Sequence, residues 1–332
     1  MSNKIESPDT SSPILIAGAG GFIGGWLVRS LRDQGFSNIR AVDLKPLTEW
    51  YQVFDDVENY SADLQLLESC RTAAEGRQFV FNLAADMGGM GFIEANKALC
   101  MLSVLINTHL LEAAREVGVE RFFFASSACV YNADKQNVTD VVPLREADAY
   151  PAMPEDGYGW EKLFSERMVR HFDEDFGVAG RVARYHNVYG PHGTWDGGRE
   201  KAPAALARKV AIAKLSGDHS IKIWGDGEQT RSFTFIDDAI YGTERLFWSE
   251  FNEPLNIGSE EMVSINQMVD ILEDIAEIKL TREYQLDAPK GVRGRNSDNT
   301  LAQSALGWKP SHKLSDGLAS TYSWISDQLK TR

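Results

Sequence analysis

The fold of this chain is decided by residues 14–24, ILIAGAGGFIG. Residues 14–17 are a compact apolar run, which is typical of a buried strand. Gly18, Gly21 and Gly24 follow at the GxxGxxG spacing, and glycines so placed let the backbone turn tightly and approach a pyrophosphate. The helix expected next would present its free N–H groups and its positive dipole end to that anion. A plain glycine turn fits the same residues, so the rest of the chain must decide between the two interpretations.

Apolar runs and amphipathic stretches alternate through the first half of the chain. The apolar runs predict strands at Ile14 to Ala17, Ile39 to Val42, Phe79 to Leu83, Phe122 to Ala125 and, later, Val178 to Arg184. Helical spacing predicts helices at Phe22 to Gln34, Leu99 to Val117, Tyr158 to Phe176 and Ala202 to Leu215. Such alternation is typical of an α/β fold with a doubly wound parallel sheet, the Rossmann arrangement.

Composition limits the partners that the protein can have. The formal net charge is −14, and nucleic-acid binding needs a basic face, so we expect no nucleic acid. No run reaches the ~20 apolar residues of a membrane-spanning helix, and residues 1–12 lack the apolar core of a secretory signal. We therefore expect a cytoplasmic protein with no membrane partner. The three cysteines and six histidines have no metal-binding spacing, so we predict no metal.

Asp43 indicates which dinucleotide the chain binds. It ends the second predicted strand about 20 residues after the glycines, where a carboxylate accepts hydrogen bonds from the adenosine ribose and repels a 2′-phosphate. This favours NAD over NADP, although Arg40 and Lys45 nearby leave room for the phosphorylated cofactor. Asp63 is expected beside the adenine, or else is an ordinary exposed loop residue. The predicted cofactor-binding residues are Gly18, Gly21, Phe22, Ile23, Gly24, Asp43, Asp63, Leu83, Ala84, Tyr158 and Lys162.

The pattern suggests three parts of the chain. Residues 1–12 are polar and are expected to form a flexible tail. Residues 13–188 carry the strand and helix repeats and are the predicted NAD-binding Rossmann domain. The pattern changes near Tyr189, and residues 189–332 are expected to form mainly a smaller C-terminal substrate-binding lobe, with some elements interleaved between the two.

Ser127, Tyr158 and Lys162 form the predicted redox site. Ser127 follows a predicted strand, while Tyr158 and Lys162 are four residues apart and so share one face of a helix. A phenol has a pKa near ~10, so a neighbouring ammonium is needed to favour its phenolate. Ser127 would hydrogen-bond the reacting hydroxyl while hydride passes to NAD. A Tyr and Lys pair at this spacing is common on solvated helices, and only its combination with the glycine loop favours redox chemistry.

Three long strings carry a closer resemblance. They are residues 82–92, NLAADMGGMGF, residues 197–205, GGREKAPAA, and residues 291–299, GVRGRNSDN. With them the chain resembles the GDP-mannose 3,5-epimerase family, a branch of the extended short-chain dehydrogenases/reductases, over nearly all its length after residue 12. The resemblance implies GDP-mannose or a related nucleotide sugar as substrate, NAD as cofactor, and a homodimer. It also implies a transient 4-keto sugar and the product GDP-L-galactose, or GDP-L-gulose if C5 alone is inverted.

Cys129 and Lys201 match the cysteine and lysine that transfer protons in that family. Oxidation of C4 to a ketone acidifies the hydrogens on C3 and C5, so a base can remove each and an acid can return it from the opposite face. Cys129 suits this chemistry only if Lys201, Lys162 or the local field lowers its thiol pKa from about 8.5. Without the resemblance, Cys129 would be interpreted as a buried structural thiol and Lys201 as a solvated lysine.

The resemblance further implies a set of substrate contacts. Arginines among them suit a diphosphate, because the guanidinium fork can bind two oxygens and keeps its charge. The predicted substrate-binding residues are Gly88, Ser127, Ala128, Cys129, Asn187, Glu200, Lys201, Ala202, Lys209, Gln229, Thr230, Arg231 and Arg295. By chemistry alone Arg293, Arg208 and His186 are equally suited, or they are surface or packing residues.

Other functions stay open at this point. A 4-epimerase or a 4,6-dehydratase of the same fold would share Ser127, Tyr158 and Lys162. A dehydratase usually carries an Asp-Glu pair beside the catalytic serine or threonine, where this chain has Ala128 and Cys129. A 4-epimerase needs no cysteine and lysine pair for proton transfer. A non-catalytic NAD-binding regulator could have lost Tyr158 or Lys162, and both are present.

Overall fold

The computed structural model describes residues 9–289 and 291–331. The predicted flexible tail covers residues 1–12, and residues 1–8 of it lie outside the described part. Asp9 to Ser12 form a turn in which the Ser12 N–H donates to the Asp9 carbonyl at 3.0 Å. The Ser37 N–H donates to the Thr10 carbonyl at 3.0 Å. The second bond ties residues 9–12 to the loop before the second strand.

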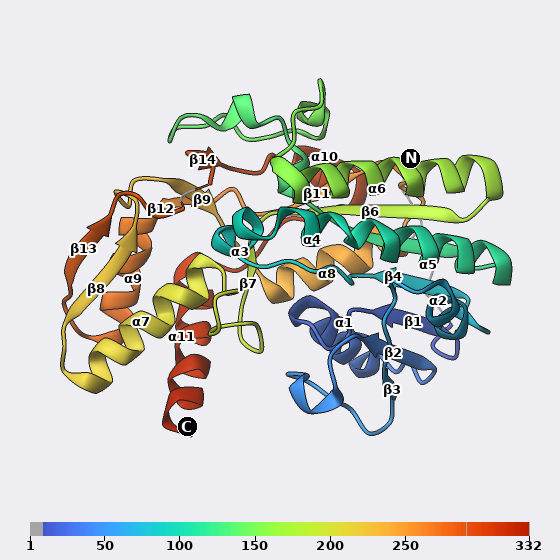
Figure 1. Ribbon diagram of the computed structural model, residues 1–332, viewed down its shortest axis with the longest axis horizontal. Coiled ribbons are helices and arrows are strands. Elements are labelled where there is room, and N and C mark those ends of the chain that lie inside the picture. Colours follow the sequence, from blue (N-terminus) through green and yellow to red (C-terminus); the bar gives the residue numbers. More distant parts are fainter. Residues whose placement is uncertain (1–8, 290, 332) are drawn as a thin grey trace.

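A seven-stranded parallel sheet forms the centre of the molecule (Figure 1). The strands are β1 (Ile14–Ala17), β2 (Ile39–Asp43), β3 (Glu58–Ser61), β4 (Phe79–Asn82), β5 (Arg121–Ser127), β6 (Ala179–Tyr185) and β11 (Leu255–Ile257). Their order is β11-β6-β5-β4-β1-β2-β3, and every pairing is parallel. The order reverses between β1 and β4, where this kind of sheet binds its ligand. The predicted doubly wound fold is confirmed.

Two strands of this sheet were missed by the sequence analysis. The other five match their predicted positions to within about two residues, the usual uncertainty of element boundaries. β3 is a polar edge strand, Glu58-Asn59-Tyr60-Ser61, so it has no apolar run to reveal it. β11 is only three residues long and comes from beyond residue 188, yet it pairs with β6. The sheet thus draws on both halves of the chain, and the proposed division at residue 188 stays a prediction.

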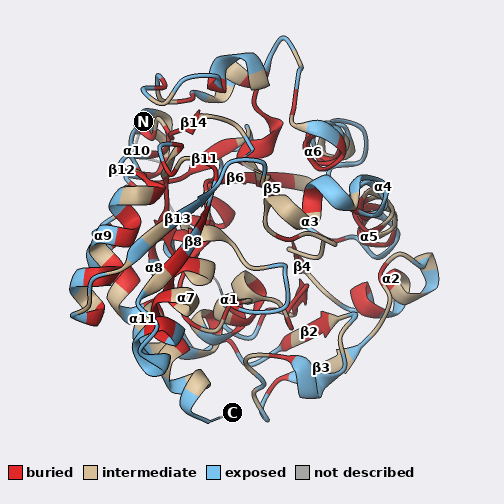
Figure 2. Ribbon diagram, turned by 60° about the vertical axis from the view of Figure 1, so that its left-hand side comes forward, coloured by how far each residue is buried: buried red, intermediate tan, exposed pale blue. Residues whose placement is uncertain are grey.

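Helices cover both faces of the sheet, and their buried sides face the strands (Figure 2). They are α1 (Phe22–Asp33), α2 (Leu67–Ala74), α5 (Ser103–Val117), α6 (Asp156–Phe176) and α8 (Ile236–Phe247). Ile14 and Ile16 pack into one core cluster with α1 and α8, whereas Leu15 packs into another with α2, α5 and α6. Strands buried on both faces read as continuous apolar runs, which is why they were visible in the sequence.

The predicted helix from Leu99 to Val117 is two helices, α4 (Lys97–Met101) and α5, which meet at Leu102. α5 ends as predicted before Gly118, whose φ of 74° is left-handed. Taken together, α4 and α5 (Lys97–Val117) form the one helical stretch among the described residues that is long and apolar enough to cross a membrane, judged by length and composition only. The statement that no such segment exists was therefore wrong. A helix with a side packed in a protein core passes the same test, because that side is apolar.

The remaining elements form the second part of the molecule, apart from α3 (Met90–Ala95), which follows β4. Its helices are α7 (Ala202–Ser216), α9 (Ile265–Ala276), α10 (Thr300–Leu306) and α11 (Leu314–Lys330). Its strands are β7 (Val188–Tyr189), β8 (Ser220–Trp224), β9 (Thr230–Ser232), β10 (Thr234–Phe235), β12 (Met262–Ser264), β13 (Thr281–Gln285) and β14 (Gly294–Arg295). α7, α9 and α11 pack together beside the β8 and β13 pair (Figure 1).

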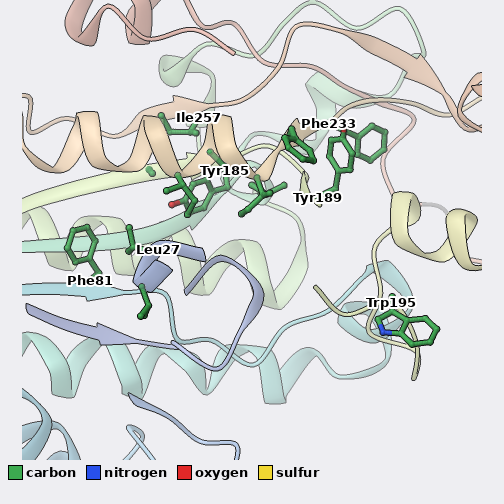
Figure 3. Packing of buried hydrophobic residues seen from close by; sticks show 14 of the residues in the cluster. Leu27, Phe81, Tyr185, Tyr189, Trp195, Phe233 and Ile257 are labelled. Atoms are coloured by element: carbon green, nitrogen blue, oxygen red, sulfur yellow. The ribbon is translucent and has the colours of Figure 1, made fainter. Parts of the chain in front are cut away.

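One hydrophobic core joins the two parts. Figure 3 shows residues of this cluster from the sheet and its first helix, Leu27, Phe81, Tyr185 and Ile257, together with residues of the second part, Tyr189, Trp195 and Phe233. All seven are buried. Because a packed core resists relative movement, side chains from distant segments keep a fixed arrangement at the carboxyl edge of the sheet.

Candidate active site

The glycine loop after β1 lies where the strand order reverses. Gly18 has a φ of 85°, in the left-handed region that favours glycine. A Cβ on Gly18 would lie 2.7 Å from the Ala84 nitrogen, and a Cβ on Gly24 would lie 2.1 Å from the Gly18 carbonyl oxygen. α1 begins after Gly21, and none of the described side chains caps its first N–H groups. A close-packed backbone and free helical N–H groups fit a dinucleotide pyrophosphate.

Asp43 ends β2, as predicted, and its Oδ1 accepts the Lys45 backbone N–H at 3.0 Å. Both basic neighbours have other partners. Arg40 pairs with Glu58 at 2.8 Å, and Lys45 Nζ donates to the Gly20 carbonyl at 3.2 Å. The two cations that could have favoured a 2′-phosphate are thus engaged elsewhere, and the Asp43 carboxylate suits the ribose hydroxyls of NAD.

The other predicted cofactor residues lie along the same edge. The Leu83 N–H donates to the last carbonyl of β1 at 2.9 Å, and the Ala84 N–H donates to the last side chain of β4 at 3.2 Å. Asp63 is partly buried, and its Oδ1 accepts a backbone N–H two residues on at 2.9 Å. Phe22 and Ile23 begin α1. These placements fit the predicted cofactor site, while the individual contacts stay predictions.

Ser127, Tyr158 and Lys162 come together as the sequence predicts. Ser127 is the last residue of β5, and Tyr158 and Lys162 lie one turn apart on α6. Both α6 side chains are buried, with Lys162 only 2% exposed. Lys162 Nζ lies 5.6 Å from the centre of the Tyr158 ring and 4.7 Å from the centre of the Phe124 ring. Its nearest carboxylate oxygen is Glu161 Oε2, at 3.5 Å.

Burial decides the protonation state of Tyr158. It raises the pKa of the phenol well above the ordinary value, Cys129 and Glu161 raise that pKa further, and a hydrogen bond with Ser127 lowers it. The spacing of Tyr158 and Lys162 predicts that the ammonium favours the phenolate. In the protein alone burial favours the neutral phenol, which is hydrogen-bonded to Ser127.

Cys129 lies in the short 3₁₀ turn Ala128–Val130 that follows β5. Its N–H donates to Ser127 Oγ at 3.2 Å, and its Sγ accepts from Arg295 Nη1 at 3.6 Å. Burial raises the pKa of the thiol and Glu155 raises it further, whereas Arg295 lowers it. The condition stated from the sequence, a thiol pKa lowered by the two lysines or the local field, is not met in the protein alone. The main opposing charge is an arginine and neither of the two lysines that the sequence suggested.

Lys201 is the residue before α7, and it is partly buried. Burial lowers the pKa of its ammonium, Arg295 lowers it too, and the charge of Cys129 raises it. A lysine with a lowered pKa can exchange protons closer to neutral pH than a solvated one. Lys201 and Cys129 therefore belong to one electrostatic site, as the resemblance implies, although their chemical roles stay predictions.

The segment that leads to Lys201 is fastened to the loop after β4. The Gly89 N–H donates to the Arg199 carbonyl at 3.0 Å, and a Cβ on Gly89 would lie 2.5 Å from the Glu200 carbonyl oxygen. The Arg199 guanidinium pairs with Asp86 and lies 3.8 Å from the centre of the Phe92 ring. Two of the strings that carried the resemblance, residues 82–92 and 197–205, thus pack against each other and fix the position of Lys201.

Two predicted substrate arginines lie side by side. Arg231 of β9 and Arg295 of β14 are register partners in the small three-stranded sheet. Burial and the charge of Arg295 lower the pKa of Arg231 to about 10. Two guanidinium groups on neighbouring strands, partly shielded from water, favour an anion between them.

Other predicted substrate residues make hydrogen bonds within the protein. Asn187 Nδ2 donates to Ser232 O, Lys209 Nζ to Lys222 O, Gln229 Nε2 to Trp224 O and Thr230 Oγ1 to Thr139 O. Glu200 accepts from Arg208, and Ala202 begins α7. A Cβ on Gly88 would lie 2.9 Å from Phe92 Cβ. These contacts stabilise the walls of the site, and substrate contact by each residue stays a prediction.

The structure separates the three residues that chemistry alone left open. His186 is fully buried, its Nε2 bonds Asn256 Oδ1 at 2.9 Å, and burial lowers its pKa to about 3. It is a neutral packing residue. Arg208 pairs with Glu200, and Arg293 pairs with Asp226 at 2.8 Å.

By contrast, Glu155 and Gln136 reach Arg295 across 140 and 159 residues of sequence. No local pattern marked either of them.

The fold and this site define a class of protein. The model of the NAD dependent epimerase/dehydratase family matches residues 14–258. A UDP-glucose 4-epimerase from Thermotoga maritima, solved with UDP-glucose, has a TM-score of 0.85 over 96% of this chain and 99% of that chain, at 25% identity. The chain belongs to the NAD dependent epimerase/dehydratase family.

Within that family, two plant proteins are nearer in sequence. GDP-mannose 3,5-epimerase from Arabidopsis thaliana is 49% identical over 327 residues, which is 97% of this chain and 84% of that protein. GDP-mannose 3,5-epimerase 1 from Oryza sativa subsp. japonica is 49% identical over 324 residues, with the same coverage. The chain is a member of this epimerase group, and the resemblance carried by residues 82–92, 197–205 and 291–299 is confirmed.

Proposed function

We propose that this chain is an NAD-dependent epimerase that inverts C3 and C5 of GDP-mannose through a transient 4-keto sugar and so makes GDP-L-galactose. The observation that carries this proposal is the pair Cys129 and Lys201, which shares one electrostatic site next to Ser127, Tyr158 and Lys162. The relatives named GDP-mannose 3,5-epimerase support the substrate. An enzyme that inverts C4 alone needs only Ser127, Tyr158 and Lys162.

The redox half of the reaction uses residues at the end of β5 and on α6. NAD bound at the glycine loop and Asp43 would supply the acceptor, and later the donor, of the C4 hydride. Ser127 orients the C4 hydroxyl, and Tyr158 in its phenolate form takes the hydroxyl proton and becomes a phenol. The buried ammonium of Lys162 favours the phenolate that must be present before this transfer, because an opposite charge favours the ionised state. The protein alone holds Tyr158 as a phenol, which suits the return of that proton when C4 is reduced.

The proton-transfer half follows from the ketone at C4, which acidifies the hydrogens on C3 and C5. In the ordinary chair of D-mannose these two hydrogens lie on the same face of the ring. One group on that face can therefore remove both, and one group on the opposite face can return both. Cys129 and Lys201 are two such groups. Inversion of C5 alone would give GDP-L-gulose instead.

Arg231 and Arg295 are the proposed contacts for the diphosphate. Their guanidinium groups lie on neighbouring strands, and the pKa of Arg231 is already lowered by burial and by Arg295. A diphosphate between them would relieve the repulsion and hold the sugar toward Cys129. Recognition of guanine rests on the names of the relatives.

We also propose a homodimer that forms through the face of α4 and α6. These two helices pack together. Five apolar side chains here are 37% to 55% exposed: Leu99 and Met101 of α4, Leu102 directly after α4, and Trp160 and Phe164 of α6. Such a patch favours a protein partner. Sedimentation should give a dimer, and Phe164→Glu should give a folded monomer.

The three free cysteines of the described chain suit the reducing cytoplasm that we propose as its location.

The function is tested by incubation of the purified protein with GDP-mannose in deuterated water, followed by identification of the product. We expect GDP-L-galactose with deuterium at C3 and C5. UDP-glucose in a parallel incubation provides the comparison, because a 4-epimerase would invert its C4 without deuterium at any carbon. That second outcome, with no label in the GDP-hexose, would contradict the proposal.

A further inference from the structure

Glu155 is a buried carboxylate that none of the roles above uses. It is the residue before α6, and its side chain is 13% exposed. Its backbone N–H donates to the Cys129 carbonyl at 3.0 Å, which fastens the start of α6 to the turn that carries the thiol. Its Oε1 pairs with Arg295, and its Oε2 is buried with no hydrogen-bond partner in the described part of the chain. A buried carboxylate so placed acts strongly on its neighbours.

The Arg295 guanidinium is held by three groups at once. Its Nε donates to Gln136 Oε1 at 2.7 Å, its Nη2 donates to Glu155 Oε1, and its Nη1 donates to Cys129 Sγ at 3.6 Å. The side chain of Arg295 is only 5% exposed. Because the fork is planar, two fixed nitrogens determine where the third one points. Glu155 and Gln136 together therefore aim Arg295 at the sulfur.

We propose that Glu155 is a positioning residue of the proton-transfer site, which fixes Arg295 against Cys129 and holds Cys129 in its thiol form in the free protein. This inference rests on the proposed function of the same site. The carboxylate and the guanidinium act on the sulfur in opposite directions, since a negative neighbour disfavours a thiolate and a positive neighbour favours it. Glu155 thereby sets the pH range in which Cys129 can exchange a proton with the sugar.

Other charged or titratable groups also act on this sulfur. They come from each element around it: Glu155 before α6, Tyr158 of α6, Arg295 of β14, Arg231 of β9 and Lys201 before α7. Among these five, Glu155 is the one carboxylate. Removal of its charge leaves the cations unopposed, so the pKa of the Cys129 thiol must fall.

The test compares Glu155→Gln, which keeps the shape and removes the charge, with Gln136→Met, which loosens Arg295 without a change of charge. The thiol is titrated in the free protein by the ultraviolet absorbance of the thiolate, after subtraction of the same protein with Cys129→Ser. We expect Glu155→Gln to lower the thiol pKa by about one unit or more, a tenfold change in the thiolate equilibrium. Gln136→Met should leave that pKa unchanged or raise it, because Arg295 then stabilises the thiolate less.

Glu155→Asp is a second variant with an intermediate expected thiol pKa, and it provides the test if Glu155→Gln does not fold. The shorter side chain withdraws the charge from the sulfur, so its thiol pKa should lie below the native value and above that of Glu155→Gln. The pH profile of epimerase turnover should shift to lower pH in the same order. The shift to lower pH is expected whether Cys129 donates or accepts the proton, because the rising and the falling limb of the pH profile both follow the pKa of this thiol.

Two results would overturn the role of Glu155. One is a thiol pKa in Glu155→Gln, or in Glu155→Asp if only that variant folds, that equals or exceeds the native value. The other is an equal fall of the pKa in Gln136→Met, which would mean that loosened packing alone is responsible. Failure of the proposed function would look different. A native protein that labels neither C3 nor C5 of GDP-mannose would contradict the function, while the thiol titration would still report on Glu155.

Discussion

The cofactor cradle and the proton-transfer site of this protein are built by different means. The cradle, residues 18–24, is one continuous segment of turn and helix start whose shape comes from its backbone, because a Cβ on Gly18, Gly20 or Gly24 would lie closer than 3.0 Å to a neighbouring atom. The proposed proton-transfer site, Cys129, Glu155, Lys201 and Arg295, gathers a thiol and three ionisable side chains from four separate segments of the chain. The cradle therefore depends on close backbone packing, and the proposed proton-transfer site depends on the charges of its side chains. Substitutions should therefore fail differently in the two places.

Tyr158→Phe should have the largest effect on turnover, because the ketone at C4 must form before C3 and C5 can lose their protons. Without the phenol the C4 hydroxyl keeps its proton, no ketone forms, and the hydrogens on C3 and C5 stay unacidified. Loss of a general acid or base costs ~10²–10⁴-fold. Both formation of the reduced cofactor and deuterium labelling should fall by this factor, measured by absorbance and by mass spectrometry. Near-native turnover in a folded variant would contradict the assignment.

Gly24→Ala and Gly25→Ala compare crowding at two adjacent positions. A Cβ on Gly24 would meet the Gly18 carbonyl oxygen at 2.1 Å, whereas a Cβ on Gly25 would come no nearer than 3.3 Å to the flexible Gln52 side chain. Overpacking costs ~1–3 kcal/mol, so we expect Gly24→Ala to weaken NAD binding by about 10–100-fold. Gly25→Ala should bind nearly as the native protein does. Calorimetry checks both, and equal affinities would contradict the role of close packing.

The sequence predicted the cradle well and the proton-transfer site only in part. The cradle follows a contiguous motif, and its strand is buried on both faces, so spacing and apolar runs were sufficient. Cys129 and Lys201 were found through the resemblance. Glu155 had no signal, since its partner Arg295 lies 140 residues away and the contact exists only in the folded chain. β3 was missed for a related reason, because an exposed edge strand has no apolar pattern.

The direction of the pKa shifts was also beyond the sequence. Spacing placed Lys162 one turn from Tyr158, but it could not show that burial raises the pKa of the phenol. It suggested lysines beside Cys129, whereas the structure has Arg295 and Glu155 there with opposite effects. Such shifts depend on the depth of burial and on partners from other segments, which no local pattern contains.

Asp43→Asn should have the smallest effect of this series and tests the carboxylate at the end of β2, beside the cradle. The amide can still bond a ribose hydroxyl, but it no longer repels a 2′-phosphate. We expect NAD binding to weaken modestly and the preference for NAD over NADP to narrow by about tenfold, or ~1.4 kcal/mol. Titration of both cofactors checks this. Equal affinity of the native protein for the two would show that Asp43 does not discriminate between them.

The central claim is that redox chemistry and proton transfer are separate functions of neighbouring residues, and Cys129→Ala in deuterated water tests it most directly. Native protein should place deuterium at C3 and C5 of the GDP-hexose and none at C4, whose hydrogen leaves and returns as hydride. Cys129→Ala should bind NAD as before and still form the 4-keto sugar, because Ser127, Tyr158 and Lys162 are intact. Its labelling at C3 and C5 should fall by ~10²–10⁴-fold. Labelling at the native rate by folded Cys129→Ala would contradict the account.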